Sequence, residues 1–121
     1  MQTQKAQYQG VQPMQSLVGL KVIEMPAASN VEGFEIKFVG AYIKGYCSHY
    51  FLPETFKTEN LIESSIVLVG EDEGRFEIVF DCGGTLIIDP APDALESPEA
   101  FTYRNENYDP PLVVVCHKRV E

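Results

Sequence analysis

A five-residue alternating pattern that occurs twice constrains the fold of this chain more than any other feature. Residues 76–80 read Phe-Glu-Ile-Val-Phe and residues 34–38 read Phe-Glu-Ile-Lys-Phe, so four of the five positions agree. Large apolar side chains at every second position lie on one face of a β-strand. The later copy continues through Asp-Cys-Gly-Gly into Thr-Leu-Ile-Ile. Residues 75–88 therefore predict a β-hairpin, because glycine readily adopts the positive φ of tight turns.

The repetition extends beyond this strand. The apolar pairs at 17–18 and 22–23 recur 44 residues later, and Pro-Glu-x-Phe at 53–56 recurs 45 residues later at 98–101. Matches in the same order at similar spacing predict a duplicated strand-hairpin unit, with copies at 17–56 and 61–101. We expect each copy to end in a Pro-Glu-x-Phe turn.

Three more segments have the composition of strands: 17–25, 41–51 and 112–117. The last is apolar on both faces, as expected for a central strand or one covered on both sides. We predict a mainly β fold with little helix, a β-sandwich or partly open barrel of about seven strands, forming a single domain over 17–121. The glutamine-rich residues 1–16 are predicted to be a flexible tail, with an arm that pairs with a partner as the alternative.

The formal net charge of −9 is concentrated in one part of the chain. Residues 71–109 hold eleven Asp and Glu but only Arg75 and Arg104, whereas the remaining residues carry seven charges of each sign. Such a field repels nucleic acid and attracts a cation or a basic protein, although an acidic surface also serves solubility alone. The spacing of Asp89, Asp93, Glu96 and Glu99 is interrupted by prolines and does not match an EF-hand loop.

Cysteine and histidine offer the clearest set of candidate metal ligands. Cys47 and His49 share a face of a strand, and Cys116 or His117 could join them in a tetrahedral zinc site. The spacing matches no known zinc motif, so we expect buried thiols and partly exposed histidines, with no metal and no cofactor. Cys82 is the cysteine expected on an exposed turn. The chain has no phosphate loop, no nucleophile elbow and no His-Glu-x-x-His motif, so we expect no enzyme.

Two further features concern environment and surface. An odd number of cysteines and the lack of an apolar N-terminal segment predict a cytoplasmic protein that does not enter a membrane. Tyr42, Tyr46 and Tyr50 fall on alternate positions of the predicted strand 41–51, which would align three phenols on one face. They suit a protein interface, and the alternative is that they cover the second side of the core.

The Leu-Val-Gly opening at 17–19, the strand at 76–80 and Gly-Thr-Leu-Ile-Ile at 84–88 resemble motifs of small bacterial β domains. Small acidic domains of this kind look like immunity proteins of bacterial toxin systems. The resemblance implies an inhibitor that covers the active site of a basic nuclease toxin, and it supplies no functional residues to carry over.

We therefore predict a cytoplasmic protein-binding domain that engages a basic protein partner, such as a toxin, by occlusion and electrostatic steering. The alternative is a structural or accessory domain without catalysis that forms a homodimer through an edge strand or the tyrosine face. A metal protein or enzyme that uses cysteine and histidine is the third and least favoured alternative. The predicted partner-binding residues are Glu71, Asp72, Glu73, Asp89, Asp93, Glu96, Glu99, Tyr42, Tyr46 and Tyr50.

Overall fold

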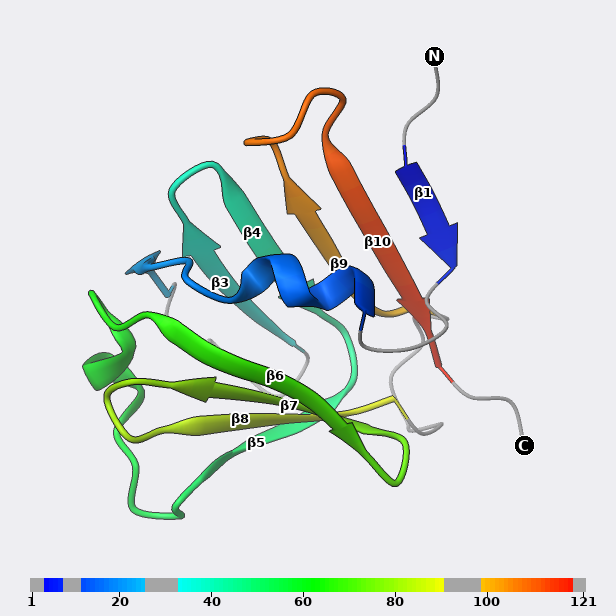
Figure 1. Cartoon of the computed structure of the whole chain (residues 1–121). Coiled ribbons are helices and arrows are strands. Elements are labelled where there is room, and N and C mark those ends of the chain that lie inside the picture. The colour runs from blue at the N-terminus through cyan, green and yellow to red at the C-terminus, as the bar shows by residue number, and fades with distance from the viewer. Residues whose placement is uncertain (1–3, 8–11, 26–32, 91–98, 119–121) are drawn as a thin grey trace.

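The computed structural model describes residues 4–7, 12–25, 33–90 and 99–118, which form two β-sheets around a shared core (Figure 1). The predicted mainly β class is confirmed, and the described part of the chain contains no α-helix. The two sheets do not close into a barrel over these residues. The described ranges contain ten strands rather than about seven, because 4–7 and 99–105 were not predicted as strands and the predicted strand 41–51 is divided in two.

The first sheet has six strands in the order β1-β10-β9-β4-β3-β2. Five of them are antiparallel to their neighbours, and β1 adds to the outside of β10 in parallel. β10 is therefore central, as predicted from its apolar residues. The strands are β1 (Gln4–Gln7), β2 (Val22–Glu24), β3 (Phe34–Phe38), β4 (Ala41–Gly45), β9 (Glu99–Asn105) and β10 (Leu112–His117).

The second sheet has four antiparallel strands in the order β5-β8-β7-β6. The predicted hairpin is confirmed, because Phe76 pairs with Ile88 and Ile78 with Leu86 across its two strands. Its turn contains Gly83 with a φ of 99°. The strands are β5 (Ser48–Leu52), β6 (Ile66–Asp72), β7 (Arg75–Phe80) and β8 (Thr85–Asp89).

Each sheet contains three consecutive strands that run up and down, followed by a strand that crosses to the other sheet. The first set is β2-β3-β4, after which β5 leaves to pair with β8. The second set is β6-β7-β8, after which the chain returns and β9 pairs with β4. Two related halves would give this arrangement, and the duplication itself stays a prediction.

Two predictions about strand limits are wrong. Residues 41–51 form two strands, β4 and β5, because the chain changes sheets at Tyr46 and Cys47. Residues 17–25 contain only the three-residue β2, since Leu17 ends the 3-10 helix η1 (Gln12–Leu17). The Pro-Glu-x-Phe matches are also not equivalent. The first is a turn after β5, where the Phe56 amide donates to the Pro53 carbonyl at 2.8 Å, whereas the described residues of the second begin β9.

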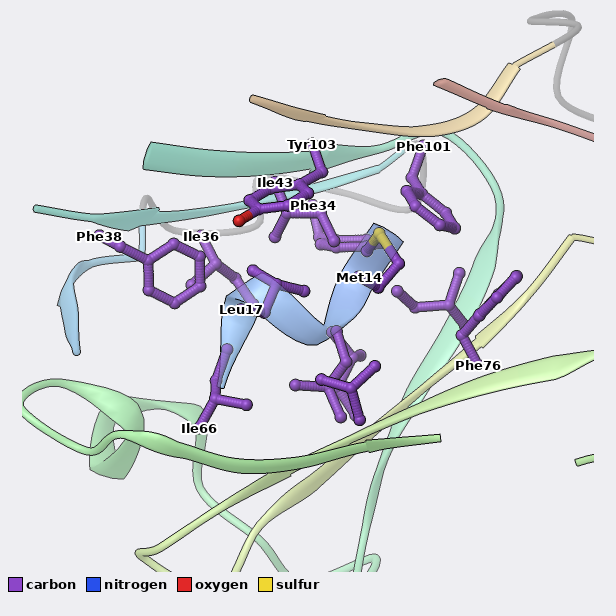
Figure 2. Close-up of a cluster of buried hydrophobic side chains, with 14 of the residues drawn as sticks. Met14, Leu17, Phe34, Ile36, Phe38, Ile43, Ile66, Phe76, Phe101 and Tyr103 are labelled. Carbon is purple, nitrogen blue, oxygen red and sulfur yellow. The ribbon is translucent and has the colours of Figure 1, made fainter. Parts of the chain in front are cut away.

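The core lies between the two sheets and is filled from both. The strand β3 contributes its three alternating apolar residues, all buried, and β7 does the same from the opposite sheet. Figure 2 shows Met14 and Leu17 of η1 inserted between Tyr103 and Phe101 of the first sheet and Ile66 and Phe76 of the second. The helix η1 therefore lies between the two sheets and fills one side of the core.

Within the described residues, the range 1–16 that was predicted to be a flexible tail contains the strand β1 and most of the helix η1. β1 pairs with β10 in register from Gln4 to Gln7, and η1 buries Met14 to 1% exposure. Two bonds hold η1 in place: the Gln15 side-chain amide donates to the Val69 carbonyl at 2.9 Å, and the Ser16 and Tyr103 hydroxyls lie 2.8 Å apart. The segment 1–16 is mostly polar, and the burial of Met14 between the sheets is what orders η1.

Main-chain bonds join the two sheets along one side. The Gly19 amide donates to the Ile66 carbonyl at 2.8 Å, and the Ile66 amide donates to the Leu20 carbonyl at 3.0 Å. Next to them, the Val22 amide of β2 donates to the Ser64 carbonyl at 2.8 Å. The 3-10 helix η2 (Thr58–Leu61) precedes this junction and buries Leu61. These bonds cover the outer edges of β2 and of the first part of β6.

Candidate functional site

The outer face of the second sheet carries apolar side chains where a solvated sheet face is normally polar. Directly opposed residues on neighbouring antiparallel strands point to the same side of a sheet. The register therefore aligns Leu68, Val79, Thr85 and Leu52 in one row across the four strands. A second row contains Gly70, Glu77, Ile87 and Tyr50. We define the apolar face as Tyr50, Leu52, Val67, Leu68, Val79 and Ile87.

The exposure of these side chains sets the apolar face apart from an ordinary surface. Val67 is 52% exposed, Leu68 49%, Tyr50 46% and Leu52 41%. A shift in register between Ile66 and Leu68 explains why two consecutive residues of β6 are exposed. Such a bulge places two residues opposite one and turns both outward. These four side chains lie on the two edge strands, and between them Val79 is half-buried and Ile87 is only 9% exposed. Exposed apolar side chains gathered on one face are typical of interaction surfaces.

An acidic hairpin borders the apolar face at one end. Glu71, Asp72 and Glu73 are all exposed at the turn between β6 and β7, at the lower right of Figure 1. Glu73 and Gly74 have φ of 53° and 81°, the pair of positive values found in type I′ hairpins. We call residues 71–74 the acidic hairpin. It projects its carboxylates into solvent on a rigid two-residue turn.

Asp89 lies at the same end of the second sheet as the acidic hairpin. Asp72 pairs with Arg75, and Asp89 pairs with Ser48 on β5. The Arg75 Nε lies 3.5 Å from an Asp89 carboxylate oxygen, with side-chain exposures of 50% and 24%. The arginine therefore offsets part of the charge at this end, and the three exposed acids of the hairpin remain in excess.

Only part of the predicted acidic set is brought together. Glu71, Asp72, Glu73 and Asp89 gather at one end of the second sheet. Glu99 is instead the first residue of β9 in the other sheet, opposite His117. Asp93 and Glu96 lie outside the described residues.

The predicted row of three tyrosines is wrong, because the strand that would carry it is divided between the sheets. Tyr42 lies on β4, on the outer face of the first sheet, directly opposite Lys37 and Arg104. Tyr46 lies at the crossing, where its amide donates to the Ala100 carbonyl at 2.7 Å. Tyr50 alone belongs to the apolar face.

Among the residues that the structure covers, no group of three or more cysteine, histidine or acidic side chains is placed to hold a metal ion. Cys47 and Cys116 are buried in the core and Cys82 is exposed on its turn, as the sequence predicted for each. The His49 ring packs against Phe34 with centroids 4.5 Å apart, and its Nδ1 lies 3.1 Å from the Cys47 carbonyl oxygen. His117 is exposed at the end of β10.

Sequence reasoning missed most of the apolar face, namely Leu52, Val67, Leu68, Val79 and Ile87. A signal was present in the comparison of the two similar strands. The outward positions of β3 are Glu35 and Lys37, whereas those of β7 are Glu77 and Val79. Val79 occupies the position that Lys37 occupies in the other copy. This change from a charged to an apolar outward residue indicates that the two outer faces differ.

Within the described ranges, no helix is long and apolar enough to cross a membrane. The resemblance to immunity-type domains stays a prediction. Comparison of the chain with protein-family models, with curated proteins and with solved structures finds no match.

Proposed function

We propose that this chain is a protein-binding domain that docks a basic protein on the apolar face, with the acidic hairpin steering and orienting the partner. The observation that carries the proposal is the position of three exposed acids at the end of an exposed apolar surface on one four-stranded sheet. Apolar contact supplies affinity at the centre of an interface, whereas charges at its rim raise the association rate and select the partner.

The proposed mode of action is occlusion by a preformed surface. The apolar face stands on paired strands, and its residues are fixed by the same register that buries the core on the other side. A rigid sheet loses little conformational entropy on binding. An inhibitor of the immunity type, which covers a basic toxin, is the concrete form of this proposal.

The difference between the two halves supports this assignment. We infer that β2-β3-β4 and β6-β7-β8 derive from one duplicated strand-hairpin unit. The outward residues of the first set are mostly charged, with Lys37 linked to Glu24 by an ion pair of 3.9 Å. The outward residues of the second set are mixed, since Val67, Leu68, Val79 and Ile87 are apolar whereas Asp72, Arg75, Glu77 and Asp89 are charged. A surface with apolar residues at positions that are charged in the other copy, such as Val79 against Lys37, is the better candidate for binding.

The first test concerns charge. We expect a neighbouring reading frame of the gene to encode a basic protein, and its purified product is the probe. The double reversal Glu71→Lys with Glu73→Lys is expected to lower the association rate by about tenfold or more at low salt and to weaken its salt dependence. Surface plasmon resonance over a range of NaCl concentrations measures both.

The matched control reverses two other exposed acids, Glu54→Lys with Glu59→Lys, which follow the end of β5 that pairs with the start of β8, away from the acidic hairpin. The total change in charge is the same, so an effect of net charge alone would lower the rate equally in both variants. Such a result, or an unchanged rate in the hairpin variant, contradicts the role of the acidic hairpin.

The second test concerns the apolar face. Val67→Ser with Leu68→Ser removes two of its exposed side chains and should increase the dissociation rate of the same probe by about tenfold or more. Ile23→Ser is the control, because Ile23 is 50% exposed but lies on β2 of the other sheet. Equal affinities of all three proteins would show that the probe binds elsewhere.

A further inference from the structure

Among the described strands, β5 is the edge strand that is both open and without Asp, Glu, Lys or Arg. An exposed strand edge presents backbone donors and acceptors that can pair with another strand, and proteins usually protect such edges with charges or covering segments. Each sheet has two edge strands, which gives four edges to compare: β1 and β2 in the first sheet, β5 and β6 in the second.

Two of the four edges are covered by the chain itself. The Val22 amide of β2 donates to the Ser64 carbonyl at 2.8 Å, and the Val22 carbonyl accepts from Glu63 at 2.8 Å. On β6, the Ile66 backbone binds Gly19 and Leu20, and the Val69 carbonyl accepts the Gln15 side chain. The last part of β6 carries Glu71 and Asp72, which oppose pairing with another acidic chain.

The remaining two edges differ in charge. β1 is four residues long and includes Lys5. β5 has the sequence Ser-His-Tyr-Phe-Leu, and residues 45–53 around it contain no Asp, Glu, Lys or Arg. Among the described strands, β5 pairs only with β8, and Figure 1 shows it at the margin of the second sheet.

The charge of the whole chain indicates what can pair there. Two molecules of net charge −9 repel each other, and this repulsion is smallest where the contact surface is locally neutral. β5 provides such a surface, and a strongly charged foreign strand would find no complementary charge on it. Antiparallel pairing of β5 with itself would place Tyr50 opposite Tyr50 of the second copy, and an aromatic pair across strands is favourable.

We propose that β5 is a dimerisation edge, which pairs antiparallel with β5 of a second copy of this chain about a two-fold axis at Tyr50. The two four-stranded sheets then form one eight-stranded sheet, and the two apolar faces become continuous. The acidic hairpin lies between β6 and β7, on the side of the sheet away from β5. With strands about 4.8 Å apart, it stays clear of the contact. The dimer therefore leaves the acidic hairpin free, whereas Tyr50 and Leu52 of the apolar face lie on the pairing strand itself.

The test is a charge exchange at the axis. Wild-type protein should sediment at about twice the monomer mass of 13.5 kDa at micromolar concentration. Tyr50→Lys and Tyr50→Glu each place like charges directly opposite one another and should each weaken dimerisation by about tenfold or more. An equimolar mixture of the two variants should regain the dimer, because opposite charges then face each other across the axis. Analytical ultracentrifugation over a concentration series measures all four samples.

Leu68→Lys is the matched control, because Leu68 is exposed on the same outer face but lies on β6. It should leave the dimer mass unchanged, as should the reversal of Glu71 and Glu73. Tyr50 is itself exposed, and a thermal melt of each variant checks that it remains folded. A strict monomer at all concentrations overturns the proposal, as does equal dissociation by Leu68→Lys or a mixture of the Tyr50 variants that stays monomeric.

Discussion

Tyr103 is the largest fully buried side chain among the described residues, and its hydroxyl connects three parts of the structure. The hydroxyl lies 2.8 Å from the Ser16 hydroxyl of η1 and accepts a bond of 2.9 Å from the Asn105 side chain. Asn105 is itself buried, and its side-chain oxygen accepts from the Asn107 amide at 2.9 Å. Burial raises the pKa of Tyr103 above its ordinary value of 10.0, although the bonds from Ser16 and Asn105 act in the opposite direction.

Replacing this hydroxyl should destabilise the protein at neutral pH. Tyr103→Phe leaves the buried Asn105 amide without its acceptor, and an unsatisfied buried donor costs about 1–3 kcal/mol. Urea unfolding at pH 7 should show a loss of this size. Tyr108→Phe is the control, because Tyr108 is 49% exposed, and its stability should match that of the wild type.

The same residue predicts a dependence on alkaline pH. A raised pKa in the folded state means that the unfolded chain loses this proton first, so the stabilisation is complete below pH about 10 and is lost as pH rises through the folded-state pKa. Tyr103→Phe cannot lose that proton. Its free energy of unfolding should therefore decline less steeply than that of the wild type as pH rises above about 10. Parallel declines in the two proteins would contradict the assignment.

At the scale of the element, η1 is the part of the structure that differs most from what its sequence predicts. Its residues Gln-Pro-Met-Gln-Ser-Leu contain only two large apolar side chains, and local composition does not indicate order. The segment is ordered by tertiary contacts instead, since Met14 and Leu17 are buried between the sheets and Gln15 and Ser16 bond to opposite sheets. Such contacts depend on residues more than 50 positions away, which no local pattern reveals.

Met14 should therefore be a major contributor to stability. Met14→Ala opens a cavity between the sheets, and substitutions of this kind in a core cost about 2–5 kcal/mol. Val18→Ala, one residue beyond η1 and 42% exposed, should change stability by less than about 0.5 kcal/mol. Chemical denaturation of the two variants measures the difference. Similar small losses in both would mean that η1 does not contribute to the core as the structure indicates.

The limits of a strand could be predicted where the alternation of apolar and polar residues was enough to define them. β3, β7 and β10 have the limits that their apolar patterns indicate, because each lies within one sheet. The crossing between β4 and β5 gave no local signal. Ile43, Gly45 and Cys47 face the core before it, and Phe51 packs against the core after it, so the alternation keeps its phase while the chain changes partners. Only the pairing itself distinguishes the two strands.

At the scale of the molecule, the acidic part of the candidate site was predictable and the apolar part was not. The turn at 71–74 is recognisable from three consecutive acids before a glycine. The apolar face is instead assembled from four strands, with Tyr50 and Leu52 brought from the first half of the chain to residues of the second. Its members become neighbours only through the register, which composition does not reveal.

The concentration of acid in one part of the chain should also make stability depend on salt. Residues 71–109 carry a net charge of −9, and the three ion pairs between described residues each include at least one half-exposed side chain. Exposed pairs contribute about 0–1 kcal/mol each, so their screening costs little. Screening of the like charges is favourable, because self-repulsion of a highly charged protein destabilises its compact state. Added salt should therefore stabilise the protein, since it weakens this repulsion more than it weakens the ion pairs.

We expect the melting temperature to rise by about 2–4 °C when NaCl is raised from about 10 mM to about 500 mM at fixed protein concentration. The double reversal Glu71→Lys with Glu73→Lys removes two of the clustered charges and adds two of opposite sign, so its increase should be smaller. Glu54→Lys with Glu59→Lys changes the net charge equally outside the cluster and should retain more of the increase. Calorimetry of the three proteins separates local repulsion at the acidic hairpin from the effect of net charge, and equal increases in both variants would assign the salt dependence to net charge alone.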